Sequence, residues 1–189
     1  TVVDITERVK AKDKIEQLAT KLSRYLSPQV YQSIFSGKKN VKIEAYRKKL
    51  TVFFSDIKGF TEITDRLEPE VLSTLLNSYL NEMSKIALKY GGTIDKFVGD
   101  AILIFFGDPE TKGDKEDAYS CVLMALEMQE RMHHLKNLWE GQGITNPLEI
   151  RIGINTGYCN VGNFGSENRF DYTIIAVSYT HLRAHETLS

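Results

Sequence analysis

The strongest constraint on the fold of this chain comes from two short strand-like runs separated by a single Gly-Asp pair. Residues 93–98 and 101–106 are rich in β-branched and aromatic side chains, and Gly99-Asp100 stands between them. Two such runs joined by two residues, with glycine first, are typical of a tight β-hairpin. The sequence therefore predicts an antiparallel strand pair in the middle of the chain, with Asp100 at its tip.

Long helical patterns lie on both sides of this hairpin. Apolar side chains recur at helical spacing over residues 69–90 and again over residues 114–139. A buried strand-like run at residues 50–55 precedes the first helix, and residues 148–154 alternate apolar and polar side chains after the second. The order strand, helix, hairpin, helix, strand predicts a ferredoxin-like, palm-type α+β fold, in which an antiparallel sheet carries its helices on one face.

The strand pattern continues after residue 154. We expect Gly157 to turn the chain into a further strand-like segment at residues 158–164. Residues 170–175 form the last strand that the pattern predicts.

The amino-terminal part of the chain is more polar. Residues 7–26 are highly charged and carry a narrow apolar seam at helical spacing. Two interpretations of this predicted helix stay open, namely an amphipathic helix packed on its own domain and a helix that forms a parallel dimer. A Ser-Pro pair at residues 27–28 ends it and begins a short second helix that Gly37 closes. The basic run within residues 38–49 is typical of a solvated connector, and contact with a phosphate or a partner is the alternative.

Composition argues against several kinds of partner. The chain has 24 basic and 25 acidic side chains, so its formal charge of −1 gives no reason to bind nucleic acid or an anionic membrane. Its longest apolar runs fall well short of the roughly 20 residues that a transmembrane helix needs. The two cysteines, Cys121 and Cys159, fit buried thiols in a reducing compartment. We expect a cytoplasmic, internal piece of a longer protein, and leave membrane attachment of that protein open.

Two aspartates stand where predicted strands end. Asp56 follows the strand-like run at residues 50–55, and Asp100 lies at the hairpin tip. In the predicted topology these strands are neighbours, so the two carboxylates approach each other and repel unless a cation lies between them. Their hard oxygen ligands favour Mg²⁺ or Mn²⁺. The alternative is that each aspartate only caps a turn.

Four sequence motifs lie in order between about Leu50 and Ile175. They read FFSDIKGFT at residues 53–61, GGTIDKFVGD at 91–100, GINTG at 153–157 and DYTII at 171–175. Together these motifs closely resemble the catalytic domain of class III adenylate cyclases. The resemblance implies that the chain converts ATP to 3′,5′-cyclic AMP and pyrophosphate in intracellular signalling.

The resemblance also implies a metal site. In this family the matching aspartates hold two magnesium ions, so Asp56 and Asp100 would bind two Mg²⁺ or Mn²⁺ ions, with the carbonyl of Ile57 as a further ligand. One ion activates the ribose 3′-hydroxyl, and the other steadies the pyrophosphate. Because amides at a helix start attract anions, the loop after Asp56 is expected to hold the phosphates. The residues of this loop are Gly59, Phe60 and Thr61.

Base selection in the family depends on a lysine in the first hairpin strand and a threonine or aspartate in the late strand. The matching residues here are Lys96 and Thr173. The lysine can donate to a ring nitrogen of adenine and the hydroxyl can accept from the 6-amino group, so the pair favours ATP. Since the family takes this pair and the metal pair from different subunits, the resemblance implies a homodimer with two sites at its interface.

Residues 2–7 resemble the final strand and exit of a PAS sensor domain, which implies a sensor upstream in the same protein. The helix at residues 7–26 would then transmit a signal by changing how two cyclase domains meet. We accordingly divide the chain into a sensor end with its linker helix at residues 1–26, a connector at 27–49, a partial cyclase domain at 50–176 and a tail at 177–189.

The resemblance ends after Ile175. The family continues with a helix that carries an asparagine and, four residues later, an arginine, both of which stabilise the transition state. Residues 177–189 match neither and are expected to be non-native. Because the loss of such groups typically costs orders of magnitude in turnover, we expect this fragment to be weak or inactive and its parent protein to be an adenylate cyclase.

Three alternative functions stay open. A diguanylate cyclase has a similar architecture, but its glycine-glycine-aspartate/glutamate-glutamate-phenylalanine hairpin is absent from this sequence. A guanylate cyclase would turn over GTP, and Lys96 argues against it. A catalytically silent nucleotide-binding or dimerisation module would bind ATP without forming cyclic AMP.

Overall fold

The computed structural model describes residues 2–22, 28–35, 44–141, 148–166 and 169–175. The chain divides into two compact units, residues 1–41 and 42–189. The predicted tail at residues 177–189 and a large part of the predicted connector lie outside the described residues.

The amino-terminal unit contains the helices α1 (Val2–Leu22) and α2 (Pro28–Phe35). α1 begins at Val2, so the strand end predicted within residues 2–7 was wrong, because these residues form the first turns of the charged helix. Pro28 opens α2, as predicted. On the apolar seam of α1, Ile15 and Leu18 are 65 % and 51 % exposed. An exposed seam of this kind can pack against either a domain or a second copy of the helix. Both interpretations of this helix therefore stay predictions.

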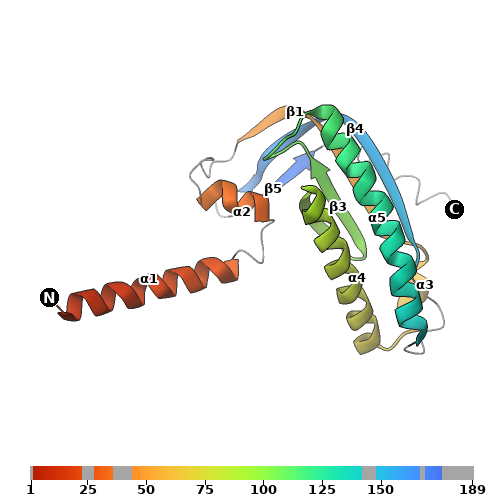
Figure 1. The fold of residues 1–189 in the computed structure, drawn as a ribbon, viewed down its shortest axis with the longest axis horizontal. Helices are drawn as coiled ribbons and strands as arrows, with labels where there is room; N and C mark the ends of the chain where they lie inside the picture. Colours follow the sequence, from red (N-terminus) through yellow and green to blue (C-terminus); the bar gives the residue numbers. More distant parts are fainter. Residues whose placement is uncertain (1, 23–27, 36–43, 142–147, 167–168, 176–189) are drawn as a thin grey trace. The chain divides into compact units, whose positions relative to one another are not determined.

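The second unit is built on one five-stranded antiparallel sheet (Figure 1). Its strands are β1 (Ala45–Ile57), β2 (Thr93–Val98), β3 (Ala101–Phe106), β4 (Ile150–Ser166) and β5 (Arg169–Ile175), in the order β2-β3-β1-β4-β5. The helices α4 (Pro69–Tyr90) and α5 (Asp114–Gly141) lie on one face of this sheet. The arrangement confirms the predicted palm-type fold and places the β2-β3 hairpin beside β1.

Two strand boundaries differ from the prediction. β1 begins at Ala45 rather than at Leu50, because its ladder with β4 already starts where Ala45 lies opposite Gly162. β4 is continuous, and Gly157 does not turn the chain but pairs with Leu50 inside the same ladder. A long antiparallel partner supplies the hydrogen bonds that keep charged residues and glycine in a strand. Local patterning contains no information about that partner.

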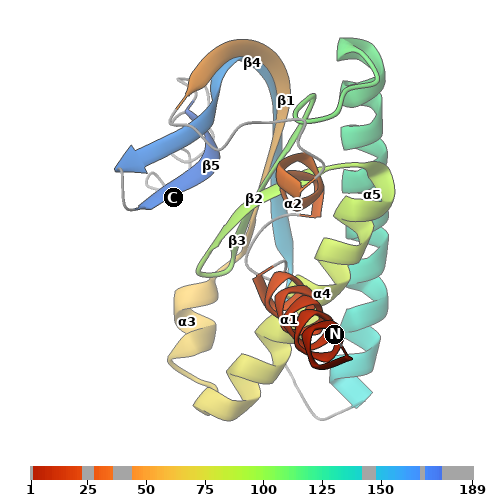
Figure 2. The same cartoon turned by 90° about the vertical axis from the view of Figure 1, so that its left-hand side faces the viewer.

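From Leu50 to its end at Ile57, β1 is buried on both of its faces. Phe53 and Ile57 belong to the cluster that packs against the helices and includes Tyr79 of α4. Val52 and Phe54 belong to a second cluster with side chains of β3, β4 and β5. Figure 2 shows what covers this second side, since β1 and β4 curve over and carry β5 to the side of the sheet away from α5. The continuous apolar run in β1 follows from this double burial.

α4 begins and ends at its sequence signals. Pro69 lies in the first turn, and Gly91 closes the helix in a left-handed conformation with a φ of 85°. α5 buries one face that includes Met124, Met128 and Trp139. Over the described part of the chain, no helix combines the length and the apolar character needed to cross a bilayer.

Both cysteines are free and buried, as predicted. Burial raises the pKa of Cys121 to about 12 and also raises the pKa of Cys159. Neutral thiols of this kind pack as small apolar side chains.

Candidate active site

The end of β1 and the tip of the β2-β3 hairpin meet at one end of the sheet. Ser55 of β1 lies opposite Ile102 of β3, so the next residue, Asp56, comes level with the hairpin tip. The backbone N–H of Ile57 donates a hydrogen bond of 2.7 Å to Oδ2 of Asp100. The structure therefore brings the two aspartates to the same end of the sheet, as the strand topology predicted, with Ile57 between them. The binding of a metal ion by the Ile57 carbonyl stays a prediction.

Asp56 is a buried carboxylate with an arginine as its counter-ion. It is 7 % exposed, and Arg151 lies opposite it on β4. Nε of Arg151 donates to Oδ1 of Asp56 at 2.8 Å, and Nη2 donates to Oδ2 at 2.9 Å. This pairing raises the pKa of Arg151. Sequence reasoning missed Arg151, because alternation marks it only as a residue on the polar face of its strand, and the register with β1 is a tertiary property.

The carboxylates of Asp56 and Asp100 form a negatively charged site near the buried Tyr79. Burial is the main cause that raises the pKa of Tyr79, and the charges of Asp100 and Asp56 raise it further. Two carboxylates with adjacent backbone oxygens are a donor set that suits Mg²⁺ or Mn²⁺. Among the described residues, no group of three or more His, Cys, Asp and Glu side chains could hold a metal ion. A divalent ion at Asp56 and Asp100 would therefore take its other ligands from the backbone, water or a phosphate.

The loop after β1 opens the short helix α3 (Phe60–Thr64). Gly59 stands at the helix start with a φ of 66°, a left-handed conformation that glycine adopts without strain. The backbone N–H of Lys58 donates to the carbonyl of Glu149 at 2.9 Å, which ties the loop to the start of β4. The structure thus places the predicted phosphate loop, residues 59–61, directly after the β1 aspartate. Its binding of phosphate stays a prediction.

The two residues predicted to read the base also come together, although they lie on the two outer strands of the sheet. Lys96 is in β2 and Thr173 is in β5. Asp95 connects them, since Oγ1 of Thr173 donates to its Oδ2 at 2.6 Å and Nζ of Lys96 lies 3.6 Å from its Oδ1. Sequence reasoning missed Asp95. The available signal was a carboxylate directly beside Lys96 in a strand that is otherwise rich in β-branched and aromatic residues.

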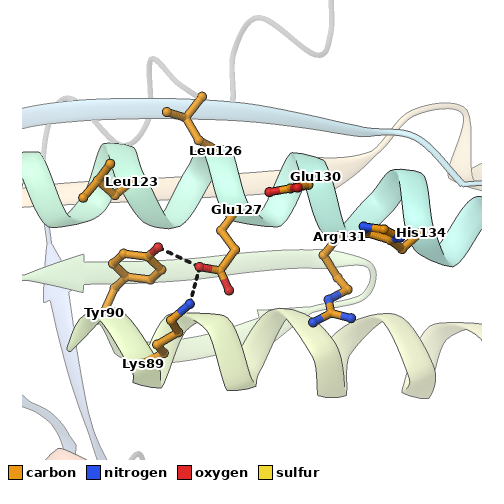
Figure 3. Close-up of a pocket in the computed structure, with 8 residues that line it drawn as sticks. All are labelled: Lys89, Tyr90, Leu123, Leu126, Glu127, Glu130, Arg131 and His134. Carbon is orange, nitrogen blue, oxygen red and sulfur yellow. Dashed lines mark hydrogen bonds and ion pairs between the residues drawn. The ribbon is translucent and has the colours of Figure 1, made fainter.

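A separate hollow lies between α4 and α5, and none of the predicted site residues lines it (Figure 3). Glu127 of α5 accepts hydrogen bonds of 2.6 Å from Nζ of Lys89 and from the hydroxyl of Tyr90. These bonds lower the pKa of Glu127 and raise the pKa of both donors. The polar groups of this hollow bond to one another and connect α4 to α5. Because the hollow contains none of the predicted site residues, we keep the end of the sheet as the candidate site.

Comparison with known proteins places these residues in a family. Residues 41–179 match the family described as the adenylate and guanylate cyclase catalytic domain. The chain belongs to this family. The whole sheet and every predicted site residue of this cyclase domain lie within the matched region.

Proteins similar to this cyclase domain include adenylyl and guanylyl cyclases. It resembles the adenylyl cyclase CyaB from P. aeruginosa, with 62 % identity and a TM-score of 0.73 over 76 % of this chain and 74 % of that chain. It also resembles the guanylyl cyclase Cya2, with 38 % identity and a TM-score of 0.69 over 74 % of this chain and 70 % of that chain. A curated relative, the adenylate cyclase of Anabaena cylindrica, is 27 % identical over 166 residues, which cover 86 % of this chain and 32 % of that protein. The chain therefore spans about a third of the length of that relative.

Proposed function

We propose that this cyclase domain is an adenylate cyclase, which converts ATP to 3′,5′-cyclic AMP and pyrophosphate for intracellular signalling. The observation that carries the proposal is the meeting of Asp56 and Asp100 at one end of the sheet, joined through the N–H of Ile57. The meeting of Lys96 and Thr173 around Asp95 supports ATP as the substrate.

The chain's residues at the β1 end fit the binding of two divalent cations and a triphosphate. Asp56, Asp100 and the carbonyl of Ile57 supply the hard oxygen donors that hold Mg²⁺ or Mn²⁺. Such ions, when bound, activate the ribose 3′-hydroxyl and neutralise the departing pyrophosphate. Arg151 pairs with both oxygens of the Asp56 carboxylate and would have to release it for a cation to bind there. The loop at residues 59–61 offers its backbone amides to the phosphates.

The base would be read by the second group of residues. Lys96 donates to a ring nitrogen of adenine, and Thr173 accepts from the 6-amino group. In the family that the sequence resembles, this pair and the metal-binding aspartates come from different subunits. We therefore propose a homodimer with two sites at its interface, and a sensor upstream in the same protein that acts through α1.

Guanylate cyclase activity is the second candidate, because the domain is 38 % identical to a solved guanylyl cyclase. Guanine carries a hydrogen on N1 and an oxygen at C6, which reverses the hydrogen-bonding roles that adenine presents there. A lysine ammonium cannot accept a hydrogen bond from N1. Lys96 therefore favours ATP over GTP.

Turnover tests the proposal. Formation of cyclic AMP from ATP and of cyclic GMP from GTP is measured with Mg²⁺ or Mn²⁺, on this chain and on the same chain with a family-type end in place of residues 177–189. We expect cyclic AMP from the restored chain. Asp56→Ala and Asp100→Ala should each lower its turnover by about a thousandfold, because each removes a carboxylate that holds the cations.

Asp65→Ala is the matched control, because it removes an exposed carboxylate just after α3 and should leave turnover unchanged. Cyclic GMP as the main product would replace the proposed substrate by GTP. If ATP binds but neither form of the chain makes a cyclic product, the enzyme proposal fails. The chain would then be a nucleotide-binding or dimerisation module that regulates an attached domain.

A further inference from the structure

A β-bulge in β2 gives Asp95 an unusual position. Ile94 pairs with Ile104 and Lys96 pairs with Leu103, so Asp95 is an extra residue in the register with β3. Bulges of this kind re-aim a side chain and are frequent beside active sites. The Asp95 side chain is 1 % exposed, although β2 is an outer strand of the sheet.

Three donors surround the buried carboxylate of Asp95. Oδ2 accepts from Oγ1 of Thr173 at 2.6 Å and from the backbone N–H of Ile174 at 3.4 Å. Nζ of Lys96 lies 3.6 Å from Oδ1. Burial raises the pKa of Asp95, and these donors oppose the rise. Asp95 thus contacts both residues proposed to read the base.

The bond between Thr173 and Asp95 restricts how the hydroxyl can act on a ligand. A threonine hydroxyl has one hydrogen and two lone pairs, and an ionised carboxylate can only accept. Because Thr173 gives its hydrogen to Asp95, its oxygen has only lone pairs left for a bound base. That oxygen can accept from the 6-amino group of adenine, but it cannot donate to the 6-oxygen of guanine or hypoxanthine.

Lys96 has the complementary property. Its ammonium group can only donate, and its ion pair with Asp95 holds it near Thr173. N1 of adenine accepts a hydrogen bond, whereas N1 of a 6-oxopurine carries a hydrogen. A fixed donor beside a fixed acceptor matches the adenine edge and opposes the 6-oxopurine edge at both positions.

We propose that Asp95 is a positioning residue that sets purine specificity, because it takes the hydroxyl hydrogen of Thr173 and holds Lys96 beside it. The pair is thereby complementary to a 6-aminopurine nucleotide and mismatched to a 6-oxopurine nucleotide. Asp95 acts through these two side chains and not on the base, since its own side chain is buried. The inference rests on the proposed function, in which Lys96 and Thr173 meet the purine.

The test compares ATP with inosine triphosphate, whose base differs from adenine in its 6-oxo group and its N1 hydrogen. Displacement of a fluorescent ATP analogue measures the affinity of both nucleotides. It is measured for this chain and for the chain with a family-type end in place of residues 177–189. In Asp95→Asn, the side-chain amide can donate to Thr173, which frees the hydroxyl hydrogen to turn toward the base. We expect the preference for ATP over inosine triphosphate to shrink by about tenfold.

Asp117→Asn is the matched control for the loss of a buried carboxylate. Asp117 accepts from the hydroxyl of Thr111 at 2.6 Å and from the backbone N–H of Lys112 at 3.1 Å, which is the same kind of donor set. Its substitution should leave the nucleotide preference unchanged.

A double variant tests whether Asp95 acts through Thr173. Thr173→Val removes the hydroxyl, so Asp95→Asn should change the nucleotide preference much less in the Thr173→Val variant than in the unaltered chain.

If Asp95→Asn unfolds normally and its nucleotide preference is unchanged, the inference is overturned and the proposed function still stands. Asp95 would then only connect β2 to β5. The inference is also overturned if Asp117→Asn lowers the preference for ATP as much as Asp95→Asn does. The same holds if Asp95→Asn has an equal effect with Thr173 and with Thr173→Val, or if the unaltered chain does not prefer ATP over inosine triphosphate. If Asp95→Asn does not fold, Asp95→Ser is the second variant, and we expect it to lower the preference for ATP by the same factor. If the unaltered chain binds neither nucleotide in either form, the proposed function fails and this inference fails with it.

Discussion

At the residue scale, Arg151 shows how the site is balanced electrostatically. Its guanidinium occupies both carboxylate oxygens of Asp56, while 48 % of its side chain stays exposed. A buried carboxylate without a counter-charge is unfavourable, so Asp56 needs a cationic partner whether or not a metal ion is bound. Arg151 and a divalent ion are therefore alternative partners for the same oxygens.

We predict that Arg151→Gln binds Mn²⁺ about tenfold more tightly than the unaltered chain, because the ion no longer displaces a guanidinium from Asp56. The spin-resonance signal of free Mn²⁺, recorded without nucleotide, measures this affinity independently of turnover. Lys58→Gln is the control, since it removes an exposed lysine paired with Glu149 in the adjacent loop. Weaker Mn²⁺ binding in Arg151→Gln would contradict this prediction. It would show instead that Arg151 keeps the Asp56 carboxylate in the orientation that binds the ion.

At the element scale, Asp108 connects strands that are not neighbours in the sheet. Its carboxylate accepts hydrogen bonds from Tyr46 and Lys48 of β1 and from Tyr172 of β5. Its carbonyl accepts from the hydroxyl of Thr93 in β2 at 2.7 Å. Since β5 pairs only with β4 in the sheet, these bonds give it a second attachment. Asp108 thus supports the curvature that carries β5 away from the helices.

We predict that Asp108→Asn lowers the free energy of unfolding by about 2–3 kcal/mol, because the amide group points a donor at groups that themselves donate. Urea unfolding followed by circular dichroism measures the loss. Asp114→Asn is the comparison, since it breaks an exposed ion pair with Lys49 and should cost less than about 1 kcal/mol. Equal losses in the two variants would contradict the role given to Asp108.

At the scale of the whole molecule, the proposed chemistry is divided between two groups of residues on one chain. The carboxylates of Asp56 and Asp100 lie where β1 meets the hairpin tip. Lys96 and Thr173 gather around Asp95, where the two outer strands of the curved sheet meet. If each site takes one group from each subunit, a homodimer contains two complete sites and a monomer contains none.

We predict that two inactive variants of the restored chain, Asp56→Ala and Lys96→Ala, recover activity when they are mixed and allowed to exchange subunits. Half of the dimers would then be mixed and each would keep one intact site, which gives about a quarter of the unaltered activity. Cyclic AMP formation measures the recovery. A mixture of Asp56→Ala with Asp100→Ala should stay inactive, because both belong to the same group. No recovery in the first mixture would argue that each site lies within one subunit.

Much of this fold and part of the site follow from the sequence by itself, because the signals are local. The Gly-Asp pair predicted the hairpin, and the proline and glycine at the ends of α4 marked its bounds. The approach of Asp56 to Asp100 needed only that β1 and β3 be neighbours. Motifs spread along one chain were enough to predict the family.

Tertiary structure alone decided the partners of these residues. Arg151 reaches Asp56 through the register between β1 and β4, and the same ladder extends β1 to Ala45 and keeps Gly157 inside a strand. Asp95 reaches Thr173 through a bulge and through the curvature of the sheet. The physical reason is that register, bulges and curvature are set by contacts between residues far apart in the chain, whereas periodicity reports only which face of an element is apolar.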